Sequence, residues 1–367
     1  MAFANYSQQA KEDPTLLSVI EFVAAGPGGL RGCEYGDERN ARKHRLGFVD
    51  CVAPLWGLCK ETWRHNQLLQ DVLVNAKHGK REWTRLHWAA ANNKVARAEE
   101  LLAMRLCEVD VRDKLGSTPL HWACMEGHVE VAKLLLDHPT KRADIEAENE
   151  DGDRPLGIAC SWGRSCVAEL LLDRGAAIDA TDRQGCTALH DASSGGHLDT
   201  VRFLLRKGAA VDAVDEFGNT PLQRSCVASC VASCVATAQA LLAAGARASH
   251  RDAFDFTPLH DACVHGRAEV ARELLSRGAD GDARDQFGKT PLIAACTCGH
   301  LAAATLLVEH GAAVNHRDND GCSALWWAND GLKEGGIEPA EGGKPASADR
   351  VAERRALVDF LTESGAT

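Results

Sequence analysis

The feature that most constrains the fold of this chain is a segment that recurs eight times along its 367 residues. The second copy reads TPLHWACMEGHVEVAKLLL and runs from Thr118 to Leu136. A register residue aligns the copies and lies 33 to 37 positions from the next one: Thr84, Thr118, Arg154, Thr187, Thr220, Thr257, Thr290 and Ser323. A period of this length is typical of stacked small units, because each unit is too short to bury its own apolar face.

Each copy begins like a short helix. Thr followed by Pro favours a helix start, since the hydroxyl accepts from free amides and Pro fits the first turn. Every copy has Leu two residues after the register residue, and all but one have Ala five residues after it, with Ser225 as the exception. Leu120 and Ala123 would share one face of the helix. Arg154 lacks the capping hydroxyl and Gly157 replaces the usual His, so the third copy is expected to lose about 1 kcal/mol of helix stability.

A second helix is predicted after each first one. Gly127 can adopt the left-handed conformation that ends the first helix. Val131, Leu134 and Leu135 then have the spacing of an apolar helical stripe. In later copies the second helix is expected to end at a glycine, before an Asp-rich turn: Gly175, Gly208, Gly245, Gly278 and Gly311. Each unit is therefore a helix pair plus a turn, and stacking closes the core.

The repeated segment resembles the ankyrin repeat family. The family signature Thr-Pro-Leu-His-x-Ala stands at 118-TPLHWA-123 and 257-TPLHDA-262, with a close variant at 187-TALHDA-192. The resemblance covers roughly residues 81 to 367 and is specific because the motif recurs so often. It implies an all-α solenoid of stacked helix pairs, with a row of short β-hairpin fingers along one edge. It also implies binding to another protein, by repeats that are not catalytic.

The amino-acid composition limits the classes of partner and of cellular compartment that we expect. The formal net charge is −11, which argues against nucleic-acid binding, because such domains usually carry a basic face. An acidic scaffold favours a partner with a basic segment. The N-terminus lacks the basic start and apolar run of a secretory signal. The fifteen cysteines are therefore expected in a reducing cytoplasmic setting, with the nucleus as the alternative.

Five cysteines share one position, directly after the Ala of the first helix: Cys124, Cys160, Cys226, Cys263 and Cys296. A small and weakly polar side chain packs well there, so a packing role is favoured over redox or metal chemistry. No metal or cofactor is expected. An alternative zinc site, through Cys33, Cys51, Cys59 and His65, lacks any CxxC pair and is a weak signal.

The chain before the first clear repeat divides into two parts. Residues 1–49 read as a non-repeat extension, whose basic run 39-RNARKHR-45 is either a localisation or phosphate-binding patch or simply a solvated stretch. Residues 50–80 are predicted to form a degenerate capping repeat, since Ala53 lies 31 positions before Thr84 and is followed by Pro-Leu. Terminal repeats are expected to be atypical because one face meets water.

Two insertions depart from the period. The extra segment 139-PTKR-142 should lie in the loop after a second helix. The stretch 225-SCVASCVASCVA-236 adds four residues, about one helical turn, and is predicted to lengthen the first helix of the fifth repeat or to distort its helix-helix turn. Residues 225–246 carry no charge, which leaves a membrane-spanning reading open, and Cys226, Cys230 and Cys234 leave a metal or lipidation site open. An in-register duplication is preferred to both, and no membrane contact is expected.

The last repeat is predicted to be interrupted by residues 331–349, a Gly-, Pro- and Glu-rich loop that cannot bury enough apolar area to order itself. A closing helix is expected from residue 350 to 363. Its apolar stripe would be Ala356, Leu357, Phe360 and Leu361. The final 365-GAT-367 resembles the end of a repeat, so this helix is expected to cap the array.

Two exposed surfaces are candidates for partner binding. Leu115, Phe217, Phe254 and Phe287 each stand three residues before a register residue, at the predicted finger tips. Aromatic side chains dominate binding hot spots, so this row could anchor a partner, although packing between neighbouring hairpins is the alternative. The shoulder of the first helices is the second surface. Its candidates are Met125, Glu126, Trp162 and His265, with partial burial against the next repeat as the alternative.

Acidic and histidine side chains also recur in fixed positions. The acids beside the tips are expected to close turns by accepting from local amides: Asp113, Glu150, Asp151, Asp153, Asp182, Asp215, Asp252, Asp285 and Asp318. The signature histidines should bond within their repeat rather than act as acids, bases or ligands: His87, His121, His190 and His260.

No catalytic motif is found. The sequence contains no GxxxxGK[ST], HExxH or GxSxG. We therefore expect a monomeric, non-enzymatic scaffold that binds a partner protein through its concave face and hairpin tips. One alternative is a substrate-recruiting adaptor of a larger machine such as a ubiquitin ligase, with residues 1–49 docking the machine. Another is the ankyrin part of a larger enzyme.

Overall fold

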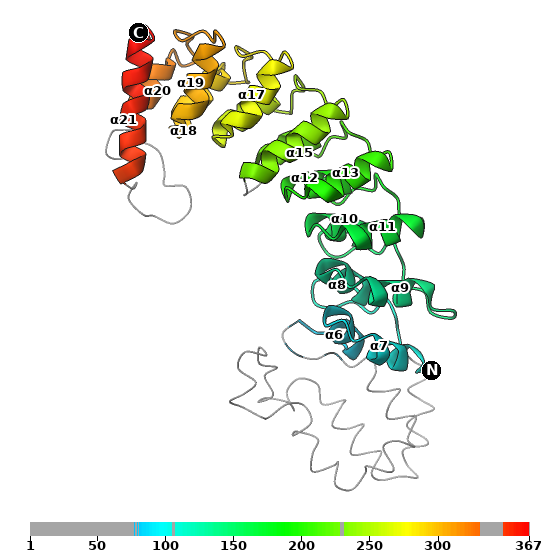
Figure 1. The fold of residues 1–367 in the computed structure, drawn as a ribbon. Helices are drawn as coiled ribbons and strands as arrows, with labels where there is room; N and C mark the ends of the chain where they lie inside the picture. Colours follow the sequence, from blue (N-terminus) through cyan, green and yellow to red (C-terminus); the bar gives the residue numbers. More distant parts are fainter. Residues whose placement is uncertain are drawn as a thin grey trace, which may run out of the picture.

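The helices of this chain form pairs that stack along a curved line. The computed structural model describes residues 77, 79, 81–104, 107–227, 231–330 and 348–366. Within these residues there are sixteen helices, eight from the first position of a repeat and eight from the second. In Figure 1 the pairs follow one another along an arc, from α6 at one extremity to α21 at the other. This is the predicted all-α solenoid.

The first helices line the inner side of the arc (Figure 1). They are α6 (Arg85–Ala91), α8 (Pro119–Glu126), α10 (Pro155–Ser161), α12 (Ala188–Ser194), α14 (Pro221–Val227), α16 (Pro258–Val264), α18 (Pro291–Cys298) and α20 (Ala324–Asp330).

The second helices form the outer layer. They are α7 (Val95–Leu102), α9 (Val129–Asp137), α11 (Ser165–Asp173), α13 (Leu198–Arg206), α15 (Val231–Ala243), α17 (Ala268–Ser276), α19 (Leu301–Glu309) and α21 (Ala348–Glu363). Each outer helix packs on its own first helix and on the outer helix of the next repeat.

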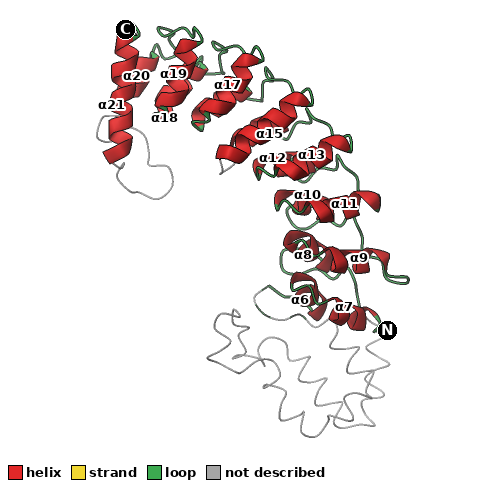
Figure 2. Cartoon of the chain, viewed as in Figure 1, coloured by secondary structure: helices red, strands yellow, loops and turns green. Residues whose placement is uncertain are grey.

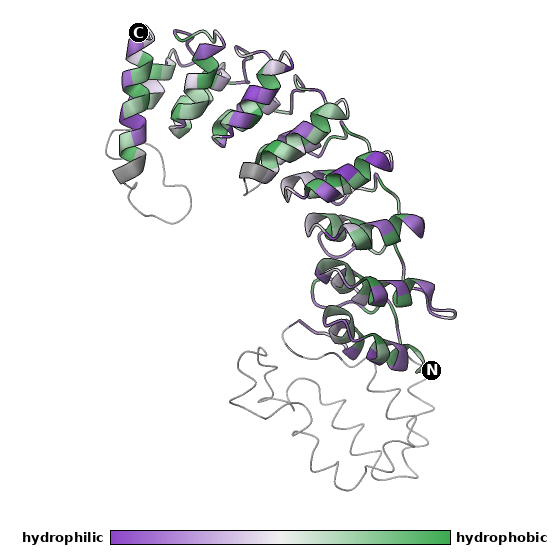
Figure 3. Cartoon of the chain, viewed as in Figure 1, coloured by the Kyte–Doolittle hydropathy of each residue, from purple (hydrophilic) through white to green (hydrophobic). Residues whose placement is uncertain are grey.

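One continuous apolar core runs through the whole stack. Leu120, Leu189 and Leu259 are 0%, 1% and 0% exposed, and all belong to a single cluster that reaches from α6 to α21. The five cysteines of the shared slot are also fully buried, which confirms their packing role. Burial raises the pKa of the Cys296 thiol to about 12, so this group stays a thiol. Figure 3 shows the corresponding alternation of hydrophobic and hydrophilic stripes on the helices.

The signature histidines tie each helix start to the next repeat. His190 Nδ1 accepts from the Thr187 amide at 3.1 Å and lies 2.9 Å from the Thr187 hydroxyl, while its Nε2 lies 3.0 Å from the Asn219 carbonyl oxygen of the following finger. The same pattern holds at the other signature histidines, which confirms their structural role: His87, His121 and His260.

Four repeats replace this histidine, with Gly157 in the third, Gln223 in the fifth, Ile293 in the seventh and Trp326 in the eighth. In the fifth, Gln223 Oε1 accepts from the Thr220 amide at 3.1 Å, so an amide side chain occupies the place of the imidazole. In the third, Arg154 starts α10 without any side-chain cap, as its sequence predicts. Its guanidinium instead pairs with Glu146 and Glu148 and donates to the Thr181 carbonyl of the next finger.

The predicted β-hairpin fingers are tight turns rather than strand pairs. Isolated β-bridges join Thr181 to Thr187 and Arg317 to Ser323, and Figure 2 draws the fingers as loops. An Asp side chain closes most turns, as expected. Asp215 Oδ1, for example, accepts from the amides of Phe217 and Asn219 at 2.9 and 2.8 Å. Such a closure replaces the strand ladder that a hairpin would need.

The third finger corrects one expectation about these turns. Glu150, Asp151 and Asp153 were expected to close it, but Asn149 Oδ1 accepts from the amides of Asp151 and Asp153, both at 2.9 Å. Asn149 lies five residues before the register residue, where six of the other seven turns have Asp and the first has Gly79. Asx side chains of both kinds can make this turn.

The two insertions are placed differently. The extra residues 139–142 lie in the loop after α9, as predicted, and Lys141 Nζ donates to the Leu102 carbonyl at 3.0 Å. The prediction that the fifth repeat lengthens its first helix or distorts its helix-helix turn falls on residues 228–230, which lie outside the described residues. α14 keeps 7 residues, and α15 has 13 where α13 has 9. Leu222 and Cys226 of α14 are both fully buried, so α14 keeps the packing of the other first helices, while the described outer helix is the longer one.

The closing helix α21 caps the array, with Leu357 and Leu361 fully buried. Phe360 packs partly against the core, but Ala356 is exposed and was wrongly assigned to the apolar stripe. Among the described helices none is both long and apolar enough to cross a membrane. Most of the predictions for residues 1–80 and 331–349, together with Cys230, lie outside the described residues.

The substitution His121→Gln tests the structural role of the signature histidines, because the fifth repeat has Gln223 at the same position. Burial lowers the pKa of His121 to about 4, so the folded state keeps it neutral while the unfolded chain is protonated below about 6.5. Stability should therefore fall as the pH drops from 6.5 toward 4. His121→Gln should reduce this fall by up to about 1.4 kcal/mol per pH unit, measured by urea unfolding.

The reciprocal substitution Gln223→His provides the control and should make the loss of stability at low pH steeper. Unchanged pH profiles in both variants would show that these side chains do not carry the register bonds.

Candidate protein-interaction surfaces

The predicted finger-tip residues are exposed in the structure. Leu115, Phe217, Phe254 and Phe287 are 54%, 45%, 45% and 55% exposed. About half of each side chain is therefore covered, and the other half is open. Three of the four come from consecutive repeats, and the fold places them in a row on neighbouring fingers.

The row is held by an unbroken chain of backbone hydrogen bonds between fingers. Each tip residue offers its carbonyl oxygen to an amide of the next finger. The distances are 2.9 Å from the Ala253 amide to Phe217, 3.1 Å from Gln286 to Phe254, and 3.0 Å from Asn319 to Phe287. Equivalent bonds join the earlier fingers back to Arg81, at 2.8 to 3.4 Å. The spacing of the tip side chains is thus fixed by the backbone.

One glycine makes the close approach of the fingers possible. Gly218 follows Phe217 and has φ +81°. A Cβ at this position would lie 3.0 Å from the Ala253 nitrogen, which is the donor to the Phe217 carbonyl. A larger residue would be strained by its backbone conformation and would also press on the bond that links the fingers.

The shoulder candidates differ in exposure. Trp162, which directly follows α10, is 53% exposed, and Glu126 and His265 are also exposed, whereas Met125 is partly buried against the core. The backbone around Trp162 is tightly packed. His197 Nε2 lies 2.9 Å from the Ser161 carbonyl oxygen, so the next repeat fixes this turn and leaves the indole outside.

Sequence analysis missed a further surface, the floor between the first helices and the fingers. The residue four places after each register residue lies there: Trp88, Trp122, Ile158, Asp191, Arg224, Asp261, Ala294 and Trp327. Several of these side chains reach the turn-closing Asp of their own finger. Trp122 Nε1 donates to Asp113 at 2.9 Å, and Trp327 Nε1 donates to Asp318 at 2.8 Å. The residue type at this one position varies among otherwise regular repeats, and this variation could have indicated the floor from the sequence.

The centre of this floor is charged. Arg224 pairs with Asp215 of its finger, with Nε and Nη2 at 2.8 and 2.5 Å from the carboxylate. On either side lie Asp191 and Asp261. Burial, with added repulsion from Asp182 and Asp153, raises the pKa of Asp191 to about 8. Burial raises the pKa of Asp261 to about 7, although a hydrogen bond from Gln223 Nε2 at 3.2 Å opposes the shift.

A small cavity accompanies the missing histidine of the third repeat. It measures about 20 Å³ and lies beside Gly157. Asp191 Oδ2 would lie 3.1 Å from a Cβ placed on this glycine. The cavity is large enough for about one water molecule, which makes it a packing defect rather than a ligand site. Within the described residues, no group of three His, Cys, Asp or Glu side chains is arranged to hold a metal.

The fold and these surfaces define a repeat solenoid with an inner floor and a row of finger tips. Comparison with known families agrees. A model described as ankyrin repeats in three copies matches residues 63–149 and 140–215, and one described as ankyrin repeats in many copies matches residues 259–308. The chain belongs to the ankyrin repeat family. The first match begins at residue 63, inside the stretch that the sequence predicts to be a degenerate repeat.

Individual relatives resemble short parts of the chain. Palmitoyltransferase ZDHHC13 of Mus musculus is 42% identical over 67 residues, which is 17% of this chain and 10% of the relative. Palmitoyltransferase AKR1 of Lachancea kluyveri is 32% identical over 78 residues, 20% and 10% of the two chains. Ankyrin repeat domain-containing protein 49 of Mus musculus is 41% identical over 51 residues, which is 14% of this chain and 21% of the relative. The chain thus matches about a tenth of the length of either palmitoyltransferase.

Removal of the Asp191 charge tests the electrostatics of the floor. The folded state holds this carboxyl protonated up to a pKa of about 8, while the unfolded chain ionises near 3.8. Stability should therefore fall as the pH rises from about 4 to 8. Asp191→Asn should raise the melting temperature more at pH 8 than at pH 5, as measured by circular dichroism. Asp199→Asn, at an exposed position on α13, is the control and should change little at either pH. Equal shifts at both pH values would contradict a buried and neutral Asp191.

Proposed function

We propose that this chain is a non-enzymatic scaffold that binds another protein across its finger tips and the floor beside them. The observation that carries the proposal is the row of Leu115, Phe217, Phe254 and Phe287, half exposed and spaced by backbone bonds between fingers. A rigid apolar row costs little conformational entropy on binding, which favours affinity. Ankyrin repeats suggest protein partners in general.

The chemistry of the floor indicates a basic segment in the partner. Asp191 and Asp261 lie between the aromatic ends of the floor, and Arg224 between them is already paired with Asp215. A lysine or arginine from a partner would favour the ionised form of both carboxyls. The chain's net charge of −11 would add long-range attraction that weakens with salt.

The proposed compartment is the cytoplasm, with the nucleus as the alternative. Eleven cysteines of the described residues are free thiols, and most are buried. Cysteines that pack as small apolar side chains fit a reducing compartment.

The palmitoyltransferase relatives favour a second candidate function. The chain could recognise substrate proteins for an acyltransferase, either as part of a longer enzyme or as a separate adaptor. The resemblance covers 67 residues of this chain, so it supports recognition and not catalysis. Binding of the same client protein by this chain and by such an enzyme would favour this candidate over an unrelated scaffold.

Substitution of the finger-tip aromatics tests the main proposal. The triple variant Phe217→Ala, Phe254→Ala, Phe287→Ala removes exposed apolar area without creating cavities, so the melting temperature should change little. Partner proteins captured from a cell lysate by the intact chain should be lost or bind at least about tenfold more weakly, since hot-spot residues each contribute 1 kcal/mol or more. The matched control is Val214→Ala, which removes an exposed apolar side chain outside the tip row. Retention of every captured protein by the triple variant would contradict a binding role for the tips.

A further inference from the structure

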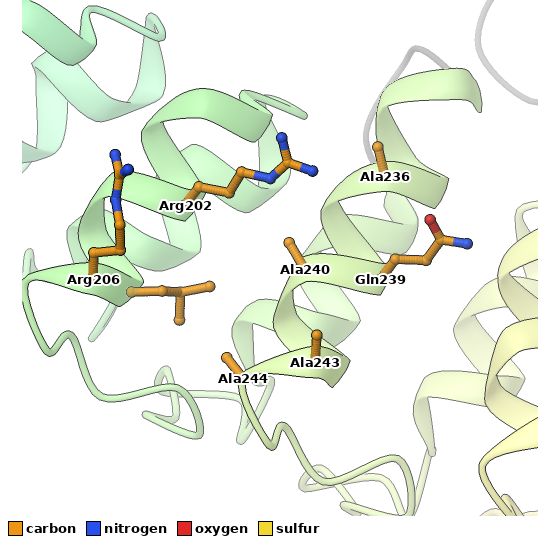
Figure 4. Close-up of a pocket in the computed structure, with 8 residues that line it drawn as sticks. Arg202, Arg206, Ala236, Gln239, Ala240, Ala243 and Ala244 are labelled. Atoms are coloured by element: carbon orange, nitrogen blue, oxygen red, sulfur yellow. The ribbon is translucent and has the colours of Figure 1, made fainter.

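A trough on the outer side of the arc lies between α13 and α15. Its volume is about 510 Å³, which is within the range of about 300–1,000 Å³ for ligand pockets. Figure 4 shows arginines from α13 on one side and alanines from α15 on the other. The residues that matter for its chemistry are Arg202, Arg206, Ala236, Ala240, Ala243 and Ala244.

The trough exists because α15 has small residues where the other outer helices have large ones. Ala240 lies five residues before the closing Gly245, and the corresponding residues of the neighbouring repeats are Leu170, Phe203 and Glu273. Among the described outer helices, α15 alone has no Asp, Glu, Lys or Arg. The wall of the trough on this side is therefore uncharged, with alanine methyl groups and the side-chain amide of Gln239.

The opposite wall carries two arginines that form no ion pair within the described part of the chain. Arg202 and Arg206 are exposed, lie one helical turn apart, and form no ion pair with any described residue. Some other cations of the outer layer do form ion pairs. Lys207 Nζ lies 3.1 Å from Asp173, and Arg277 Nη2 lies 3.0 Å from Glu273. The trough thus combines an apolar floor with a local excess of positive charge.

We propose that the α13/α15 trough is a second docking surface, separate from the finger tips, for a helical segment of a partner protein that carries two acidic residues one turn apart. Alanine methyls allow the backbone of a third helix to approach closely, as small residues do in other helix contacts. Two carboxylates at positions i and i+4 match the spacing of Arg202 and Arg206, and each can accept two hydrogen bonds from a guanidinium. The inner floor, by contrast, favours a basic segment, so the two surfaces select partners of opposite charge.

The test uses the full chain and a synthetic probe. The probe is a fluorescein-labelled helical peptide of about five turns, with alanine on one face and glutamates at i and i+4 beside it. Fluorescence anisotropy should show saturable binding that weakens with salt, and the same peptide with lysines for glutamates should not bind. The double variant Arg202→Glu, Arg206→Glu should weaken binding of the glutamate peptide at least about tenfold. Ala240→Phe, which fills the trough without changing its charge, should weaken it as well.

Matched controls separate this surface from the others. Arg272→Glu reverses an arginine at the equivalent position of α17, which faces Glu269 of its own helix, and should leave peptide binding unchanged. The triple finger-tip variant should also bind the peptide normally, so a failure of the tip proposal would not affect this one. The proposal is overturned if the glutamate peptide does not bind, if both peptides bind equally, or if the charge-reversed protein binds normally with an unchanged melting temperature. Arg202-dependent binding to phosphatidylserine vesicles without peptide binding would also overturn it, because the surface would then recognise a membrane.

Discussion

The burial of one face of each helix pair against the next pair is the interaction on which the whole structure depends. The leucines two places after the register residues, such as Leu120 and Leu259, are completely buried although no repeat is large enough to enclose them by itself. The repeats on either side bury these leucines. At an ordinary transfer free energy, each buried leucine contributes about 1.5–3 kcal/mol, and these contributions vanish if the stack comes apart. The ends of the array therefore need caps, and α21 serves as one of them.

Polar side chains fix the position of each repeat relative to the next, which apolar packing alone would not specify. The signature histidine joins the start of its own helix to the carbonyl of the next finger, and the turn-closing Asp joins the finger to itself. Backbone bonds then run from finger to finger along the edge. Because these bonds are satisfied inside the fold, variable residues at the tips and on the floor can change without loss of the scaffold. Specificity can thus be carried by the few side chains that the scaffold leaves exposed.

The sequence predicted the repeats, the helix pairs and the finger-tip row, because each of these depends on residues at fixed offsets. It failed at two kinds of position. The turn of the third finger was assigned to Glu150, Asp151 and Asp153, although Asn149 closes it, because Asn as well as Asp can accept from the turn amides. The floor and the outer trough were missed because they are formed by side chains from separate repeats. Asp191, for example, is shifted in pKa by Asp182 and Asp153, which come from other elements.

The two candidate surfaces differ in charge as well as in place. The inner floor presents partly buried carboxyls beside aromatic residues, while the outer trough presents arginines beside alanines. The two proposed surfaces lie on opposite sides of the arc, so together they would allow two partners to bind at the same time.

The central claim, that neighbouring repeats share one apolar seam, is tested most directly by circular dichroism of two fragments. One contains a single repeat, residues 187–219, and the other contains four, residues 118–256. The account predicts that the four-repeat fragment is helical and melts cooperatively, whereas the single repeat has neither helical signal nor transition, since about three repeats are needed for stability. A helical single repeat with its own cooperative melting transition would contradict the account.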